Sequence, residues 1–226
     1  MKISIKSIII IAIFSFYQNK MYSQVINWGN IPIQNKHLLH VDIGAEHGAI
    51  AGVGYHHLIP IKGCPLWLGG EFSMLSGSQL TDDFKVRLGA QIKIFELNHF
   101  QFSTRVHGIA RRYYNQSVTL FNFGSDLAGT IGYYRKHWFL GVEVGFDKAI
   151  VTHFKHSDWY KRNIYDNVQD GWYEPATGGN FYYGVQGGIS FKKIDITLKA
   201  GKVLQQDFKS RPLLPFYGQV GLNFRF

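Results

Sequence analysis

Residues 216–226 read FYGQVGLNFRF, a stretch in which apolar and polar side chains occupy alternate positions. Successive side chains of a β-strand point to opposite sides, so the stretch predicts a strand with one apolar and one polar face. The apolar face runs through Phe224 to Phe226, the last residue, whereas the end of a soluble domain usually lies in water. The pattern therefore indicates a strand whose apolar face contacts an apolar medium.

The same period of two recurs along the chain and is clearest at residues 84–94, where Phe84 and Val86 begin one face and Lys85 and Arg87 begin the other. No helix has this period. We expect strands at residues 39–45, 49–55, 66–74, 84–94, 100–111, 120–134, 138–146, 181–191, 194–204 and 216–226. The total is about ten if the first two segments form separate strands around a turn at His47-Gly48. One long strand there, and a total of eight strands, are the alternatives.

A chain with these segments and this terminal strand resembles the outer-membrane β-barrel proteins of Gram-negative bacteria, whose last strand commonly ends in Phe or Trp. The resemblance implies an all-β fold, an antiparallel transmembrane β-barrel of up-and-down topology. It also implies that Phe224 and Phe226 form a C-terminal signal for the outer-membrane barrel assembly machinery.

The N-terminal residues agree with export. Lys2 and Lys6 precede an apolar run at residues 8–16, which has the length of a signal-peptide core and is too short for the roughly 20 residues of a membrane-spanning helix. We expect residues 1–23 to be a signal peptide cleaved after Ser23 and residues 24–226 to form one barrel domain in the outer membrane. An uncleaved signal anchor that holds a periplasmic domain is the alternative.

Composition narrows the class further. Aromatic residues make up 16% of the chain, charged residues only 17%, and 25 residues are Gly, which is a β-rich profile with few surface charges. Cys64 is the single cysteine, so the chain has no intramolecular disulfide, and its distance from the signal excludes a lipoprotein anchor. We expect no cofactor and no metal, because His153 and His156 lack a defined third ligand.

The polar face of the strands distinguishes a membrane barrel from a soluble, lipocalin-like one, which would alternate as well. A hydrated outer face should be rich in Lys, Glu, Ser and Thr, but here Gly recurs, as at Gly54, Gly69, Gly89, Gly145 and Gly184. Glycine weakens a strand unless crowding requires it. We therefore expect the polar face to line a narrow lumen and the apolar face to contact lipid.

This assignment places charged residues of both signs in the lumen. The positive members are Lys85, Arg87, Lys93, Arg105, Arg111, Lys199 and Arg225, and the negative members are Asp42, Glu46, Glu71, Asp126, Glu143, Asp147 and Asp195. Charges removed from bulk water need partners, so we expect ion pairs across the lumen. Because a ten-stranded barrel is close to the size that side chains fill, a filled lumen is favoured over an open pore, and a narrow conduit for small solutes is the functional alternative.

The connections between the strands alternate in length. Those expected in the periplasm are short and those outside are long, the longest at residues 151–180, as such barrels show. The net charge of +9 raises the possibility of nucleic-acid binding, which export makes improbable. Basic residues in the outer connections instead indicate contact with lipid phosphates and lipopolysaccharide. The candidates are Arg112, Lys148, Lys155, Lys161, Arg162, Lys209 and Arg211.

The long connection also carries the candidates for recognition and catalysis. Its amphipathic and basic side chains predict a binding surface, or else packing of the loop and an interfacial aromatic belt. The binding candidates are Trp159, Tyr160, Lys161, Arg162, Trp172 and Tyr173. His156-Ser157-Asp158 places a base, a hydroxyl and a carboxylate in sequence, similar but not identical to the His-x-Ser arrangement of the lipid A deacylases. Adjacent residues on an extended chain point apart, so the tripeptide is a weak catalytic candidate.

These observations favour an outer-membrane barrel with a filled polar lumen and a structural or surface-binding role. A narrow channel and a lipid-active hydrolase remain the alternatives. The sequence identifies neither the ligand nor the oligomeric state.

Overall fold

The computed structural model describes residues 25–31, 35–46, 48–75, 82–175, 178–210, 212 and 214–226. The expected signal peptide, the turn residue His47 and the basic residue Arg211 lie outside this part of the chain. The strands are β1 (His37–Ala45), β2 (Ala49–Ile59), β3 (Leu66–Leu75), β4 (Asp83–Leu97), β5 (Phe100–Tyr114), β6 (Val118–Tyr134), β7 (Trp138–His156), β8 (Gly171–Tyr173), β9 (Gly179–Ser190), β10 (Ile194–Gln205) and β11 (Phe216–Arg225).

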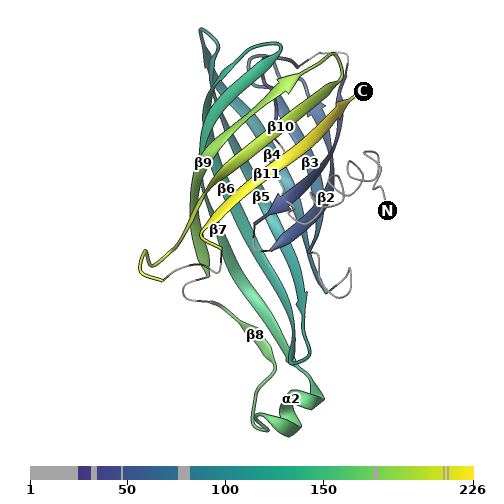
Figure 1. The fold of residues 1–226 in the computed structure, drawn as a ribbon, viewed down its shortest axis with the longest axis vertical. Coiled ribbons are helices and arrows are strands. Elements are labelled where there is room, and N and C mark those ends of the chain that lie inside the picture. Colours follow the sequence, from purple (N-terminus) through teal and green to yellow (C-terminus); the bar gives the residue numbers. More distant parts are fainter. Residues whose placement is uncertain are drawn as a thin grey trace, which may run out of the picture.

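Ten of these strands close into an antiparallel barrel whose strands are inclined to its long axis (Figure 1). Each strand pairs with the next along the chain, except that β7 pairs with β9, and β1 pairs with β11 to close the cylinder. The short β8 pairs with the far end of β7 and adds no barrel strand. β1 and β2 form a hairpin, so the predicted total of ten strands in up-and-down order is confirmed.

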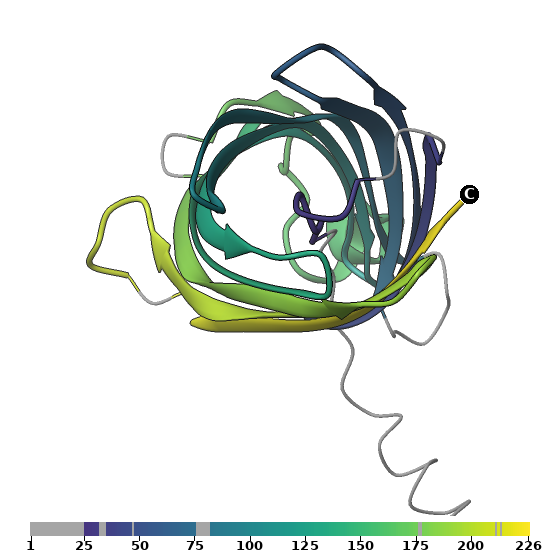
Figure 2. The ribbon, with the colours of Figure 1, turned by 90° about the horizontal axis from the view of Figure 1, so that it is seen from above.

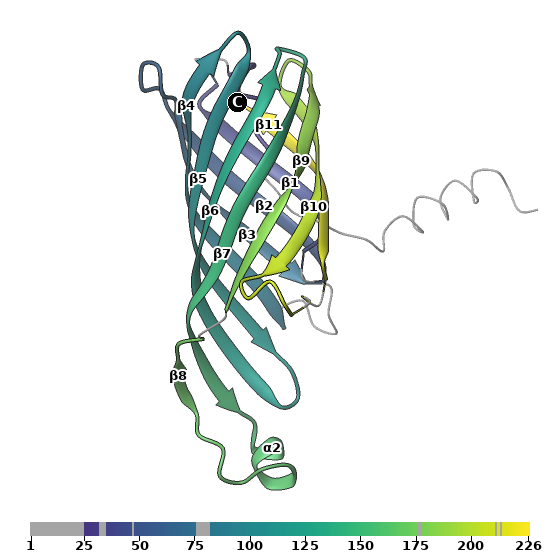
Figure 3. The same ribbon diagram turned by 90° about the vertical axis from the view of Figure 1, so that its left-hand side faces the viewer.

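The two ends of the barrel differ. The connections β4–β5, β6–β7 and β9–β10 are tight, and we call their side the short-turn end. The opposite side, the long-loop end, carries the connection that contains helix α2 (Asp158–Asn163) and β8. β6 and β7 are the longest strands, and together with β5 they project past the others at this end (Figure 3). We call residues 112–123 and 150–173 the extension.

Within the residues described, no helix is long and apolar enough to span a membrane.

The outward face of the barrel is apolar. On β7, Trp138, Leu140, Val142 and Val144 are 48–62% exposed, whereas the alternate residues, Glu143 among them, are buried inside. A soluble barrel would have the reverse arrangement, with water outside and an apolar interior. The outward face therefore suits lipid, and the soluble, lipocalin-like alternative does not fit the structure.

Glycines on the inward face make room for large side chains of neighbouring strands. A Cβ atom at Gly54 would collide with the ring of His40, at Gly69 with that of His56, and at Gly145 with that of Tyr182. The prediction that small residues on this face accommodate long ones is confirmed.

Candidate functional site in the barrel lumen

The segment before β1 closes the lumen at the short-turn end. Residues 25–30, which we call the N-terminal plug, lie inside the ring of strands (Figure 2). Val25, Ile26 and Trp28 are 1–4% exposed and belong to one apolar cluster with inward-facing barrel residues. The barrel members of this cluster are Leu38, Leu58, Trp67, Tyr134 and Phe139. The lumen thus contains a buried apolar cluster at this end, which the prediction of a polar lumen did not include.

Hydrogen bonds fix the plug to three regions of the barrel. The side-chain amide of Asn27 donates to the hydroxyl of Ser190 at 2.7 Å and to the carbonyl oxygen of Arg135 at 2.9 Å. Asn223 donates to the carbonyl oxygen of Val25 at 2.8 Å, and Arg225 donates to that of Asn30. The plug was not predicted: the apolar residues that precede the first strand indicate burial but not where the segment docks.

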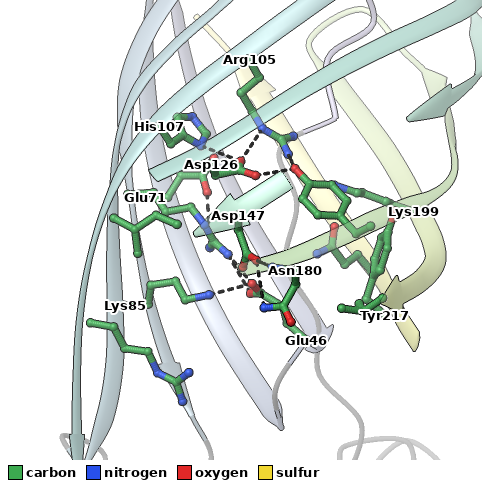
Figure 4. A pocket seen from close by; sticks show the side chains of 16 residues that line it. Glu46, Glu71, Lys85, Arg105, His107, Asp126, Asp147, Asn180, Lys199 and Tyr217 are labelled. Atoms are coloured by element: carbon green, nitrogen blue, oxygen red, sulfur yellow. Dashed lines mark hydrogen bonds and ion pairs between the residues drawn. The ribbon is translucent and has the colours of Figure 1, made fainter. Parts of the chain in front are cut away.

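An ion-pair cluster from four strands fills the centre of the lumen. Figure 4 shows its members Arg105, Asp126 and Lys199. Arg105 on β5 lies 3.3 Å from Asp126 on β6 and 3.2 Å from Glu143 on β7. Glu143 also pairs with Lys199 on β10. Arg105 donates to the hydroxyl of Tyr182 at 2.9 Å, and that hydroxyl donates to Asp126 at 2.5 Å. Burial of these charges is tolerated because each cation faces a carboxylate.

A second cluster lies nearer the long-loop end. Glu46 accepts hydrogen bonds from Lys85 and Arg87, each at 2.7 Å. Arg87 also lies 3.9 Å from Glu71. Arg111 pairs with Asp83 on the neighbouring strand, a residue that was not among the predicted lumen charges. These pairs leave both signs of charge on the walls of the outer half of the lumen.

Three buried histidines lie beside these carboxylates. His40 is 3.4 Å from Asp42, His56 is 3.8 Å from Glu71, and His107 is 3.8 Å from Asp126. Their positions on the polar face were predictable from the alternation, but their contacts were not. Among the residues described, no group of three or more His, Cys, Asp or Glu side chains could hold a metal ion.

A cavity of about 160 Å³ lies among the two clusters, with Glu46, Arg111 and Asn180 among its lining residues (Figure 4). Asp147 also lines it and accepts hydrogen bonds from the backbone and side chain of Asn180 at 3.2 and 3.0 Å. The cavity has room for several water molecules or a small polar molecule. Its walls offer hydrogen-bond donors, acceptors and charges of both signs.

Three of the fourteen predicted lumen residues lie near the short-turn end, apart from these clusters. Lys93 pairs with Glu96 at 2.5 Å near the short-turn end. Asp195 and Arg225 pair with each other at 2.8 Å next to the plug. The ion pairs of the lumen therefore form separate groups at different depths. Asp42 lies near His40, and the other predicted residues belong to the clusters or line the cavity.

The predicted loop-binding residues do not form one surface. Trp172 packs against Phe123, with ring centroids 6.0 Å apart, on the outward face of the extension. Tyr173 packs against Phe154 at 5.4 Å and, as the next residue of the same strand, points to the opposite face. Tyr160 lies 5.3 Å from the ring of His156. Trp172 and Tyr173 therefore lie on opposite faces of the extension. Trp159 and Arg162 are exposed on α2, and Lys161 pairs with Asp170.

The tripeptide His156-Ser157-Asp158 has structural contacts instead of a catalytic relay. Ser157 caps α2: its hydroxyl accepts the backbone N–H of Tyr160 at 3.1 Å and donates to the carbonyl oxygen of Gln116 at 2.8 Å. His156 bonds to Asp170 through Nδ1 at 2.9 Å and through its backbone N–H at 2.8 Å. These bonds, with one from Lys161, hold the pKa of Asp170 well below its ordinary value.

The two C-terminal aromatics face outward. Phe226 exchanges backbone hydrogen bonds of 3.0 Å with His37, and its ring stacks on that of His37 with centroids 5.5 Å apart. Phe224 pairs with Leu39 of β1. The last strand therefore closes the barrel against the first.

Comparison with known proteins yields similar folds at low identity. No family model matches the chain, and no curated protein matches it. A solved structure described as outer-membrane expressed OmpT of Vibrio cholerae matches at 8% identity and a TM-score of 0.33 over 85% of this chain and 62% of that one. LpxR from Salmonella typhimurium matches at 9% identity and a TM-score of 0.38, covering 87% and 86% of the two chains.

A mutant of the Rhodopseudomonas blastica porin matches at 7% identity and a TM-score of 0.20, covering 85% of this chain and 99% of that one. With a coverage of 62%, the chain spans less than two thirds of the length of the Vibrio cholerae structure. On its own geometry, a closed, even-stranded antiparallel barrel with an apolar outer face, this chain has the fold of an outer-membrane β-barrel protein.

Proposed function

We propose that this chain is an integral outer-membrane protein whose barrel is closed to solutes and which presents its long-loop end at the cell surface as a binding platform. The observation that carries the proposal is the N-terminal plug. It joins the apolar cluster that occupies the lumen at the short-turn end. A transport channel needs a continuous hydrated path, which a buried apolar layer interrupts.

The orientation follows from the asymmetry of the connections. Outer-membrane barrels have short turns in the periplasm and longer loops outside. The short-turn end, with the plug, would then lie in the periplasm, as expected for the segment that follows a cleaved signal peptide. The outward-facing Phe224 and Phe226 are available to the assembly machinery in this arrangement.

The extension supports the binding part of the proposal. Three barrel strands continue beyond the others and carry β8 and α2 at their end. Trp159, Tyr165 and Trp172 are 45–58% exposed there. Large aromatic side chains give contact area at a small entropic cost, so such a surface suits recognition. A hydrolytic role has less support, because the hydroxyl of Ser157 is engaged as a helix cap.

Single-channel recording in planar lipid bilayers tests the closed lumen. The purified, folded protein should give no stable conductance steps, whereas an open porin recorded in the same bilayers should conduct. Folding is checked by heat-modifiable migration on a gel. Reproducible, stable conductance from the folded wild-type protein would show that the lumen is open and would sink the proposal.

A further inference from the structure

An ordered row of side chains crosses the outward face of the extension. Arg112 on β5 is the register partner of Phe121 on β6, Phe121 is the partner of His153 on β7, and His153 is the partner of Trp172 on β8. These four residues, which we call the lipid-phosphate row, lie side by side on four neighbouring strands. Phe121 and Trp172 are 41% and 58% exposed. The row lies on the same face as Leu127, a residue of the lipid-facing belt.

The level of the row follows from strand geometry. Phe100 and Tyr133 lie on the outward face at the short-turn end, and Arg112 and Phe121 are each about twelve residues further along the same strands. At about 3.3 Å per residue and a tilt of about 40°, that distance corresponds to about 30 Å along the membrane normal. The apolar band of such barrels is about 25 Å tall, so the row lies at the level of the lipid headgroups of one leaflet.

The charged side chains on the outward face of the described strands are all positive. Among the described strand residues, the outward positions carry four Lys or Arg and no Asp or Glu. The four are Arg112, Lys148, Lys155 and Lys202, and all lie toward the long-loop end. Lys155 is one position beyond the row on β7, paired with Thr119, which in turn pairs with Tyr114. The guanidinium of Arg112 lies 5.7 Å above the ring of Tyr114. Two cations thus flank one group of aromatic rings.

We propose that the lipid-phosphate row, with Lys155, binds the phosphorylated headgroup of a lipid in the external leaflet. The proposal rests on the proposed function in one respect, the placement of the long-loop end at the outer surface. The row is continuous with the lipid-facing belt, so the acyl chains of a lipid whose headgroup lies there would meet that belt directly. Arginine and lysine bind phosphate oxygens through charge-assisted hydrogen bonds, and aromatic side chains concentrate at the interface. Binding of a soluble partner would require neither the position of the row at the headgroup level nor its continuity with the lipid-facing belt.

Native mass spectrometry of the folded protein, titrated with lipid A that carries both phosphates, tests this site. The variant Arg112→Gln with Lys155→Gln removes two cations, and Lys62→Gln with Lys136→Gln removes two exposed cations from the short-turn end as the matched control. One charge near anionic lipid contributes about 1 kcal/mol, so the double variant should bind about 30-fold more weakly. The control should bind like the wild type.

Dephosphorylated lipid A is the second arm. The wild-type protein should bind it about as weakly as the double variant binds the phosphorylated lipid. A double variant that binds phosphorylated lipid A within threefold of the wild type, or equal binding of both lipids by the wild type, would overturn the proposal. Heat-modifiable migration confirms that each variant is folded. The conductance experiment reports on the lumen and not on this face, so failure of the closed lumen can be distinguished from failure of the lipid site.

Discussion

Removing the carboxylate of Glu143 should destabilise the barrel more than any single change on its surface. Glu143 is 1% exposed and is the acceptor for both Arg105 and Lys199. In the variant Glu143→Gln the side chain keeps its shape and loses its charge. Arg105 retains Asp126 at 3.3 Å, whereas the ammonium group of Lys199 is left over the rings of Tyr182 and Tyr217, at 5.6 and 5.3 Å from their centroids. The loss therefore falls mainly on Lys199.

The size of the effect follows from the cost of a stranded charge. Breaking a buried ion pair by removing one partner costs about 3–5 kcal/mol, because the remaining charge is buried without compensation. Replacing the stranded cation as well, in Glu143→Gln with Lys199→Met, should recover a large part of that loss. The comparison isolates the charge from any packing effect of the glutamine.

Urea titration of the protein folded in lipid vesicles, followed by tryptophan fluorescence, measures the change. We expect the free energy of unfolding to fall by about 3–5 kcal/mol for Glu143→Gln and to rise again in the double variant. Glu96→Gln is the control: the side chain of Glu96 is 45% exposed, and exposed ion pairs contribute about 0–1 kcal/mol. A loss below 1 kcal/mol for Glu143→Gln, or no recovery with Lys199→Met, would refute the reasoning.

Three further predictions concern the plug, the glycines and the long loop. Trp28→Ala should lower the free energy of unfolding by about 3–5 kcal/mol and speed proteolysis of the plug in the intact barrel, because Trp28 is buried in an apolar cluster; unchanged proteolysis would contradict the seal. Gly89→Ala should impair folding, since its Cβ would collide with the backbone of the neighbouring strand, whereas Gly108→Ala, whose Cβ would lie at an ordinary 3.8 Å from the carbonyl oxygen of Leu88, should be tolerated; equal folding yields would argue against crowding as the cause. Because the pKa of Asp170 is depressed, its stabilising contacts should persist above the ordinary carboxyl value of about 3.9 and be lost only as the pH falls through the lower folded value. Hydrogen exchange of the loop between pH 7 and pH 2 tests this, with Asp170→Asn as control, and loosening of the wild-type loop already between pH 6 and pH 5 would contradict it.

Much of the architecture follows from the alternation of side chains between the two faces of each strand. With Phe226 outside, Arg225 and Asn223 must point inside, and both are buried there. The same rule holds around the barrel because each side chain of a strand has only two directions available, so alternation also predicted which residues face the lumen.

The alternation also placed Trp67 and Leu38 on the inward face, together with Glu71 and Asp42, yet that face was described as polar. The difference arises because a face can change chemistry along its length, and the plug supplies apolar partners only at one end. A segment without a period carries no signal of where it docks. Alternation alone could therefore not predict the plug.

Ion-pair partners were beyond prediction for a related reason. Glu46 follows β1 and pairs with Arg87 on β4, three strands away, while Arg105 and Asp126 are on adjacent strands. Which charges meet across a narrow lumen depends on the stagger of strands around the cylinder. That stagger is set by long-range pairing and has no local sequence signature.

The order of layers along the lumen gives the site a direction. An apolar plug closes the short-turn end, paired charges occupy the centre, and the cavity lies in the half nearer the long-loop end. A molecule that enters this cavity must therefore come from the long-loop side and leave by the same route, unless the plug is released. A cavity that is reached from one side of the membrane only can bind a molecule but cannot conduct it across the membrane. On the proposed function, the three residues that anchor the plug, Asn27, Asn223 and Arg225, are therefore the ones that keep the barrel from acting as a channel.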